Sequence, residues 1–72
     1  MQISYNTKTD VLYMRLDDRK QPVINRRVAD DIVLDMGADE KVIGIEILGA
    51  SAHVNLKDLL PIEYQVSAGI SA

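Results

Sequence analysis

The sequence predicts an α+β fold: a small antiparallel sheet of four to five strands, connected as hairpins or a β-meander, with one short C-terminal helix. Up to Leu48, segments in which polar and apolar residues alternate are separated by turn-forming residues. After Ser51 the apolar spacing changes from two residues to three or four. The 72 residues allow one domain. We expect residues 1–66 to form a single β-rich domain and residues 67–72 a frayed tail.

Four segments before the central stretch predict strands of this sheet. Gln2–Tyr5 and Val11–Leu16 are joined by five polar, turn-forming residues, which predicts a β-hairpin. Val23–Val28 carries charged residues on both faces and is most easily placed at a sheet edge. Ala29–Asp31 interrupts the alternation and predicts a bulge or corner before the strand Ile32–Met36.

Val42–Leu48 is the most apolar and most β-prone stretch, and we expect the rest of the chain to cover or extend it. Ile43, Ile45 and Ile47 share one face and predict a core-facing set. The opposite face must be covered by the terminal helix, by the segment around Tyr64, or by another subunit. The candidate interaction residues are therefore Val42, Gly44, Glu46, Leu48 and Tyr64.

The remaining elements follow from turn and helix signals. Gly37 opens the turn before the central stretch and is the expected site of a positive φ. Ala52–Leu60 predicts a short helix that starts at an N-cap, Asn55, and is stopped by Pro61. Ile62–Val66 predicts either a last edge strand or an extended arm.

Composition excludes several classes of function. The net charge of −3, without a basic stripe and without Phe or Trp, argues against direct binding of nucleic acid. The absence of Cys excludes disulfides and thiolate metal sites and fits a cytoplasmic location. No apolar run approaches the roughly 20 residues of a membrane span. We expect no cofactor, and we expect self-association as a homodimer to supply the stability that a thin core lacks.

Acidic residues are the main candidates for chemistry, and each has a structural alternative that we favour. Asp10 is expected to form a turn, and the pairs Asp17–Asp18 and Asp30–Asp31 to be solvated rather than to bind a cation. Glu46 lies in the most apolar strand, so its pKa should rise unless a cation pairs with it. Arg15 or Arg27 is the expected cross-strand partner.

A polar site is the alternative to a purely structural role. Ser51 and His53 are residue types of hydrolytic sites, but their spacing lacks the glycine-framed elbow of a nucleophile, so capping or surface positions are expected. An enzyme or ligand-binding domain would instead need at least two of Tyr13, Asp35, His53 and Glu46 to converge in a concave pocket with polar groups.

Several segments resemble a family of small prokaryotic proteins known as domain of unknown function 2283. They are Ile3-x-Tyr5, Asp10-x-Leu12-Tyr13-Met14-x-Leu16, Asp35 and Gly44-Ile45-Glu46-Ile47-Leu48-x-Ala50-Ser51. The family usually has a glycine where this chain has Asp31, so the corner there is expected to differ. The resemblance implies a compact antiparallel sheet, a cytoplasmic location and no established activity. Members encoded beside small toxin-like genes suggest an antitoxin-type partner role.

The leading hypothesis is therefore a non-enzymatic protein-interaction module that self-associates and serves as the antitoxin-like partner of an adjacent small protein. The alternative is a small enzyme or ligand-binding domain that uses Glu46, Asp35, Tyr13 or His53. A third hypothesis, compatible with the first, is a dimer whose arm Ile62–Val66 is exchanged between subunits.

Overall fold

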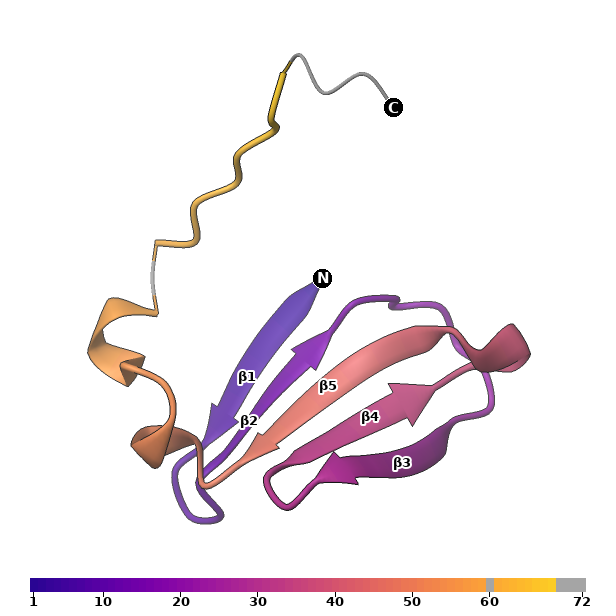
Figure 1. Ribbon diagram of the computed structural model, residues 1–72, viewed down its shortest axis with the longest axis horizontal. Helices are drawn as coiled ribbons and strands as arrows, with labels where there is room; N and C mark the ends of the chain where they lie inside the picture. The colour runs from indigo at the N-terminus through magenta and orange to yellow at the C-terminus, as the bar shows by residue number, and fades with distance from the viewer. Residues whose placement is uncertain (60, 69–72) are drawn as a thin grey trace.

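A single five-stranded antiparallel sheet makes up most of the structure, a computed structural model that describes residues 1–59 and 61–68 (Figure 1). The order of the strands is β1-β2-β5-β4-β3, so β5 is the central strand although it is the last of the five in the chain. The strands are β1 (Gln2–Asn6), β2 (Val11–Arg15), β3 (Ile24–Ala29), β4 (Ile32–Met36) and β5 (Val42–Leu48).

The predicted strands are confirmed, each to within one residue at either end. The expected irregularity near Ala29 appears as a register shift between Arg27 and Ala29 where β3 pairs with β4. A second register shift, which alternation did not predict, lies between Asp35 and Met36 where β4 pairs with β5. The hairpin β1–β2 and the hairpin β3–β4 therefore flank β5 on its two sides.

The prediction of an α+β fold is wrong, because no α-helix forms in the described chain and the protein is all-β. Between β5 and residue 68, the described residues form two 3-10 turns, η2 (Ala50–Ala52) and η3 (Leu56–Asp58). Asn55 does cap η3, since its side chain accepts a hydrogen bond from the backbone N–H of Lys57 at 3.3 Å. Pro61 lacks an amide donor and disfavours helical backbone in the residue before it, which leaves too few residues for a stable helix. Leu60, the last residue of the predicted helix, lies outside the described residues.

The turn before β5 also differs from the prediction. Gly37 has a φ of −92° rather than a positive value, and the left-handed residues are Asp39 and Glu40, both at φ 57° in η1 (Ala38–Glu40). A Cβ at Gly37 would lie 2.5 Å from Oε1 of Gln21, the end of a side chain that can turn aside, and 3.0 Å from Cγ2 of the buried Ile43. The backbone N–H of Gly37 closes the turn on the carbonyl of Lys41 at 2.7 Å.

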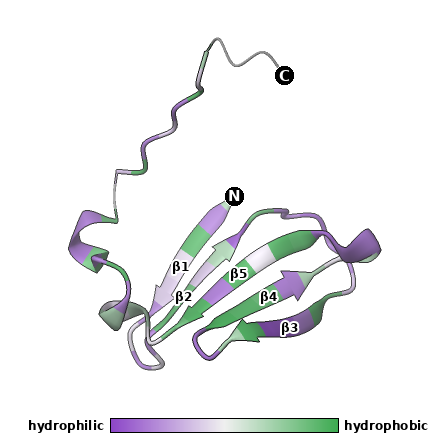
Figure 2. Ribbon diagram, in the orientation of Figure 1, coloured by the Kyte–Doolittle hydropathy of each residue, from purple (hydrophilic) through white to green (hydrophobic). Residues whose placement is uncertain are grey.

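One face of the sheet is apolar. Pairing of β2 with β5 sets Leu12 opposite Ile47, and Ile45 lies opposite both Met14 of β2 and Leu34 of β4. Residues opposite one another in adjacent strands project to the same side. We call this side the apolar face; in β1, β2, β4 and β5 its residues are Ile3, Tyr5, Leu12, Met14, Ile32, Leu34, Ile45 and Ile47, and β3 adds Arg26 opposite Leu34. Much of β4 and β5 is accordingly coloured as hydrophobic in Figure 2.

The core is thin because the described chain provides no second layer over the apolar face. Leu12 and Ile43 are 2% exposed, yet Ile45 and Ile47 of the central strand remain partly exposed. The segment after β5 passes beyond β1 instead of folding over the sheet (Figure 1). Residues 62–66 form no strand there, and Tyr64 is 88% exposed. Of the residues predicted as a frayed tail, 69–72 lie outside the described part of the chain.

Candidate functional site

The opposite face of the sheet carries a polar cluster over its central strand. Tyr13 of β2 and Val33 of β4 both lie opposite Glu46 of β5. Asp35 of β4 lies opposite Gly44 of β5. Three adjacent strands therefore bring together three of the four residues proposed for a polar site, Tyr13, Asp35 and Glu46.

Asp35 is the centre of this cluster. Its side chain is buried, with the residue 7% exposed, and both carboxylate oxygens accept hydrogen bonds. The hydroxyl of Tyr13 donates to Oδ2 at 2.8 Å, and Nδ2 of Asn25 donates to Oδ1 at 2.6 Å. Satisfying both oxygens of a buried carboxylate offsets the cost of removing it from water. Asp35 thereby joins β2, β3 and β4 across the polar face.

Gly44 leaves the space in which Tyr13 reaches Asp35. A Cβ at this position would lie 2.6 Å from the hydroxyl oxygen of Tyr13 and 3.1 Å from Oδ2 of Asp35. A contact of 2.6 Å is too short for a carbon and an oxygen that share no hydrogen bond. The hydrogen bond between Tyr13 and Asp35 occupies the space that a side chain at position 44 would fill, so it depends on the glycine there.

Glu46 has no cationic partner among the described ion pairs, and the predicted pairing with Arg15 or Arg27 is wrong. The pKa of Glu46 is raised above its ordinary value, first by burial and second by repulsion from the Asp35 carboxylate. The rise expected for an unpaired Glu46 is therefore confirmed. Arg27 instead donates to the backbone carbonyl of Asp30.

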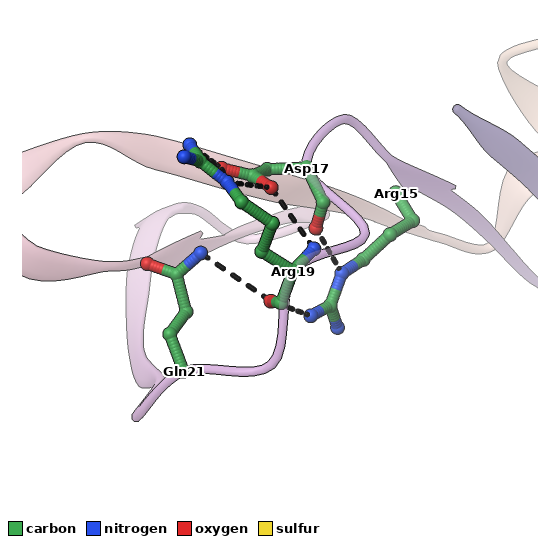
Figure 3. Close-up of polar contacts among 4 residues, drawn as sticks. All are labelled: Arg15, Asp17, Arg19 and Gln21. Atoms are coloured by element: carbon green, nitrogen blue, oxygen red, sulfur yellow. Dashed lines mark hydrogen bonds and ion pairs between the residues drawn. The ribbon is translucent and has the colours of Figure 1, made fainter.

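Arg15 is held by the loop that follows β2 (Figure 3). Its Nε donates to the carbonyl of Asp17 at 2.6 Å and its Nη2 to the carbonyl of Arg19 at 3.4 Å. Asp17 in turn accepts from Arg19, with the nearest side-chain contact at 2.7 Å, and these hydrogen bonds hold the pKa of Asp17 far below its usual range. The guanidinium of Arg15 thus binds local carbonyls and, through Nη1 at 3.5 Å, the hydroxyl of Tyr13, and it forms no ion pair with Glu46.

The other acidic pairs have neighbours of their own. Asp18 lies 3.4 Å from the N-terminal amine, and Oδ2 of Asp31 lies 2.9 Å from Nε2 of His53. Of the four residues named for a polar site, His53 therefore contacts Asp31 and not the cluster of Tyr13, Asp35 and Glu46. Within residues 1–59 and 61–68, no group of three or more His, Asp or Glu side chains is arranged to hold a metal ion.

Asp10 forms a second cluster that sequence reasoning did not foresee. It occupies the β1–β2 turn with φ 56°, as expected for a turn residue, and its carboxylate accepts from three donors. The hydroxyl of Tyr5 lies at 2.6 Å, and the Oγ and backbone N–H of Ser51 at 2.7 and 3.0 Å. The hydrogen bonds from Ser51 and then Tyr5 lower the pKa of Asp10. This cluster fixes the chain after β5 against the first hairpin.

Two of the hollows on the surface of the described chain lie away from the polar cluster. One is lined by residues of the loop after β2 and of the turn before β5, among them Asp17, Lys20 and Lys41. The other follows residues 4–8 at the β1–β2 turn. Tyr13, Asp35 and Glu46 therefore converge outside both of these hollows.

The interaction candidates named from the sequence stay a prediction. Val42 is 39% exposed and Tyr64 is 88% exposed, whereas Gly44 is buried beneath Tyr13 and Asp35. Glu46 and Leu48 are partly exposed on the polar side of β5. The segment of residues 62–66, which includes Tyr64, lies beyond the β1 edge and away from β5 (Figure 1).

The raised pKa of Glu46 predicts a specific dependence of stability on pH. Because the fold favours the protonated carboxyl, this group stabilises the fold fully below its ordinary pKa, and that contribution is lost as the pH rises through the raised pKa. Glu46→Gln stays neutral, so it should match the wild type near about pH 4 and be more stable near about pH 8. Thermal melts of both proteins across this range check it. Equal melting temperatures at all pH values would contradict the prediction.

No helix among the described residues is long and apolar enough to span a bilayer. A family model described as a protein of unknown function (DUF2283) matches residues 2–51, which include all five strands and both hydrogen-bonded clusters. Searches of curated proteins and of solved structures found no match.

Proposed function

The chain belongs to the DUF2283 family of proteins of unknown function, and we propose that it is a non-enzymatic interaction module that self-associates through the apolar face of its sheet. The observation that carries the proposal is the partial exposure of Leu34, Ile45 and Ile47 at the centre of the sheet. Interior positions of a five-stranded sheet are normally covered by a second layer. The described chain supplies none.

A second copy of the chain is the occupant that fits this face. Two copies related by a two-fold axis would pack their apolar faces as a sandwich, in which each sheet forms the missing layer of the other. A domain of 72 residues gains much from such burial, because folding of a single copy buries only about 60% of the surface that the unfolded chain exposes. The polar cluster remains outside the sandwich and fixes the relative positions of the strands.

Two substitutions on neighbouring residues of β4 test this proposal. Leu34→Glu places a charge on the apolar face, where Arg26 lies opposite and can pair with it in the isolated chain. Val33→Lys places a charge on the polar face opposite Glu46. We expect Leu34→Glu to weaken the dimer at least about a hundredfold, because the charge would be buried in the interface, and Val33→Lys to change it by less than about threefold.

Light scattering and sedimentation at micromolar concentrations measure both effects. A wild-type chain that stays monomeric and thermally stable would overturn the proposal. Equal weakening by the two substitutions would also contradict it, since both faces would then be equivalent.

The finer proposal is that the dimer acts as an antitoxin-type partner of a small protein encoded beside it, and the family resemblance alone supports it. Co-expression of the two proteins should give a complex that purifies together and suppresses any toxicity of the partner. Separate elution of the two proteins would count against this role and leave the self-association untouched.

A small-molecule site at Tyr13, Asp35 and Glu46 is the second candidate, favoured by their convergence on adjacent strands. Because the oxygens of Asp35 are already satisfied, a ligand would have to bind beside Glu46 rather than displace Tyr13. A saturable shift of the amide resonances of Gly44 and Glu46 on addition of compounds from a fragment collection would support this site. Resonances that do not move with any compound would remove it.

A further inference from the structure

The C-terminal arm, defined as residues 62–66, has the pattern of a strand without a sheet. Its three large apolar side chains occupy alternate positions, and in an extended chain they project to one side. Ile62, Tyr64 and Val66 are 50%, 88% and 73% exposed. Glu63 and Gln65 occupy the positions between them. Such alternation favours pairing with an existing sheet edge.

β3 provides a sheet edge that is open along its length. It pairs only with β4 in the described sheet, so the other side of its backbone has unpaired N–H and C=O groups. All six of its residues are exposed, including Ile24 at 71% and Val28 at 53%. An exposed edge of this kind is a template for an additional strand.

The side chains of the arm and of β3 are complementary in one antiparallel register. With Glu63 opposite Arg27, an acidic side chain meets a basic one on the polar side of the sheet. The same register sets Tyr64 opposite Arg26, where the guanidinium can stack on the ring, and Val66 opposite Ile24. β1, the other edge strand, offers only uncharged residues and no cation for Glu63.

The position of the arm identifies which copy it binds. In its own chain the arm lies beyond β1, whereas β3 is the opposite edge of the sheet (Figure 1). We infer that the arm of one copy adds to β3 of a second copy as an antiparallel strand, and that the exchange is reciprocal. This inference rests on the proposed self-association and names a segment that holds the two copies together.

Charge reversal in the full chain tests the exchange. Glu63→Arg sets like charges opposite each other at both arm sites of its dimer, and so does Arg27→Glu. We expect each variant alone to dimerise about tenfold more weakly than the wild type. An equimolar mixture should regain wild-type affinity, because each heterodimer then has one original pair and one reversed pair. An arm that bound its own chain would give no recovery on mixing.

Controls separate this inference from the proposed function. Lys8→Glu makes a comparable charge change in the β1–β2 turn and should not restore Glu63→Arg on mixing. Tyr64→Asp alters a side chain that is 88% exposed, so it should leave the fold intact while weakening the dimer. A wild-type dimer that neither Glu63→Arg nor Tyr64→Asp weakens would overturn the arm exchange alone. A wild-type monomer would overturn both proposals.

Discussion

Replacing Leu12 by alanine is expected to lower the free energy of unfolding by about 2–5 kcal/mol, the usual range for a buried leucine. Leu12 is 2% exposed and lies between Tyr5 of β1 and Ile47 of β5. A domain of this size has a total stability of only about 4–11 kcal/mol. The substitution therefore removes a large part of the stability, and urea unfolding followed by circular dichroism measures it.

Leu16→Ala is the matched control for this prediction. The residue follows β2 and is 43% exposed, so the same loss of side-chain volume should cost less than about 1 kcal/mol. The difference in the free energy of unfolding between the two variants measures how much more the burial of Leu12 stabilises the sheet than that of Leu16. Similar losses at both positions would show that burial in the isolated chain does not set the stability.

Gly44→Ala is expected to have the second large effect, a loss of about 1–3 kcal/mol, although alanine in place of glycine usually stabilises by about 0.4–1 kcal/mol through the unfolded chain. The steric effect should win because the new Cβ lies 2.6 Å from the hydroxyl oxygen of Tyr13. Relieving that contact moves Tyr13 away from Asp35 and leaves a buried carboxylate with one partner fewer.

A double-mutant cycle with Tyr13→Phe isolates this mechanism. In the wild type, Tyr13→Phe removes the hydrogen bond to Asp35 and should destabilise the protein. In the Gly44→Ala background the hydrogen bond is already lost and the clash is relieved, so the same change should cost little or stabilise. Denaturant unfolding of the four proteins measures the coupling. Strictly additive losses would contradict a shared contact.

The strands were predictable because their information is local. Alternation sets which residues of Val42–Leu48 share a face, and turn-forming residues on either side mark where the strands end. The helix prediction failed because the spacing of apolar residues in Ala52–Leu60 does not tell whether that segment packs against the sheet. Asn55 formed its cap as predicted, but Pro61 left too short a segment, and the chain after β5 passes beyond β1 instead of over the apolar face.

The side-chain partners were less predictable because they depend on competition among distant groups. Glu46 was expected to pair with Arg15 or Arg27, yet the guanidinium of Arg15 binds the carbonyls of Asp17 and Arg19, and that of Arg27 binds the carbonyl of Asp30. The bond between Asp10 and Ser51 joins residues 41 positions apart. Its only signal in the sequence is indirect. Because Val11 at the start of β2 pairs with Leu48 at the end of β5, Asp10 just before β2 comes close to the residues just after β5.

The central strand of the sheet, β5, is also the last strand to be synthesised, and this affects folding on the ribosome. The hairpins β1–β2 and β3–β4 form from contacts between near neighbours, which close quickly. Each hairpin alone is too small to be stable, and the two meet only through β5. The ribosome must therefore release the chain through Leu48 before either hairpin gains a lasting partner, and until then nascent chains have open edges that favour contact with one another.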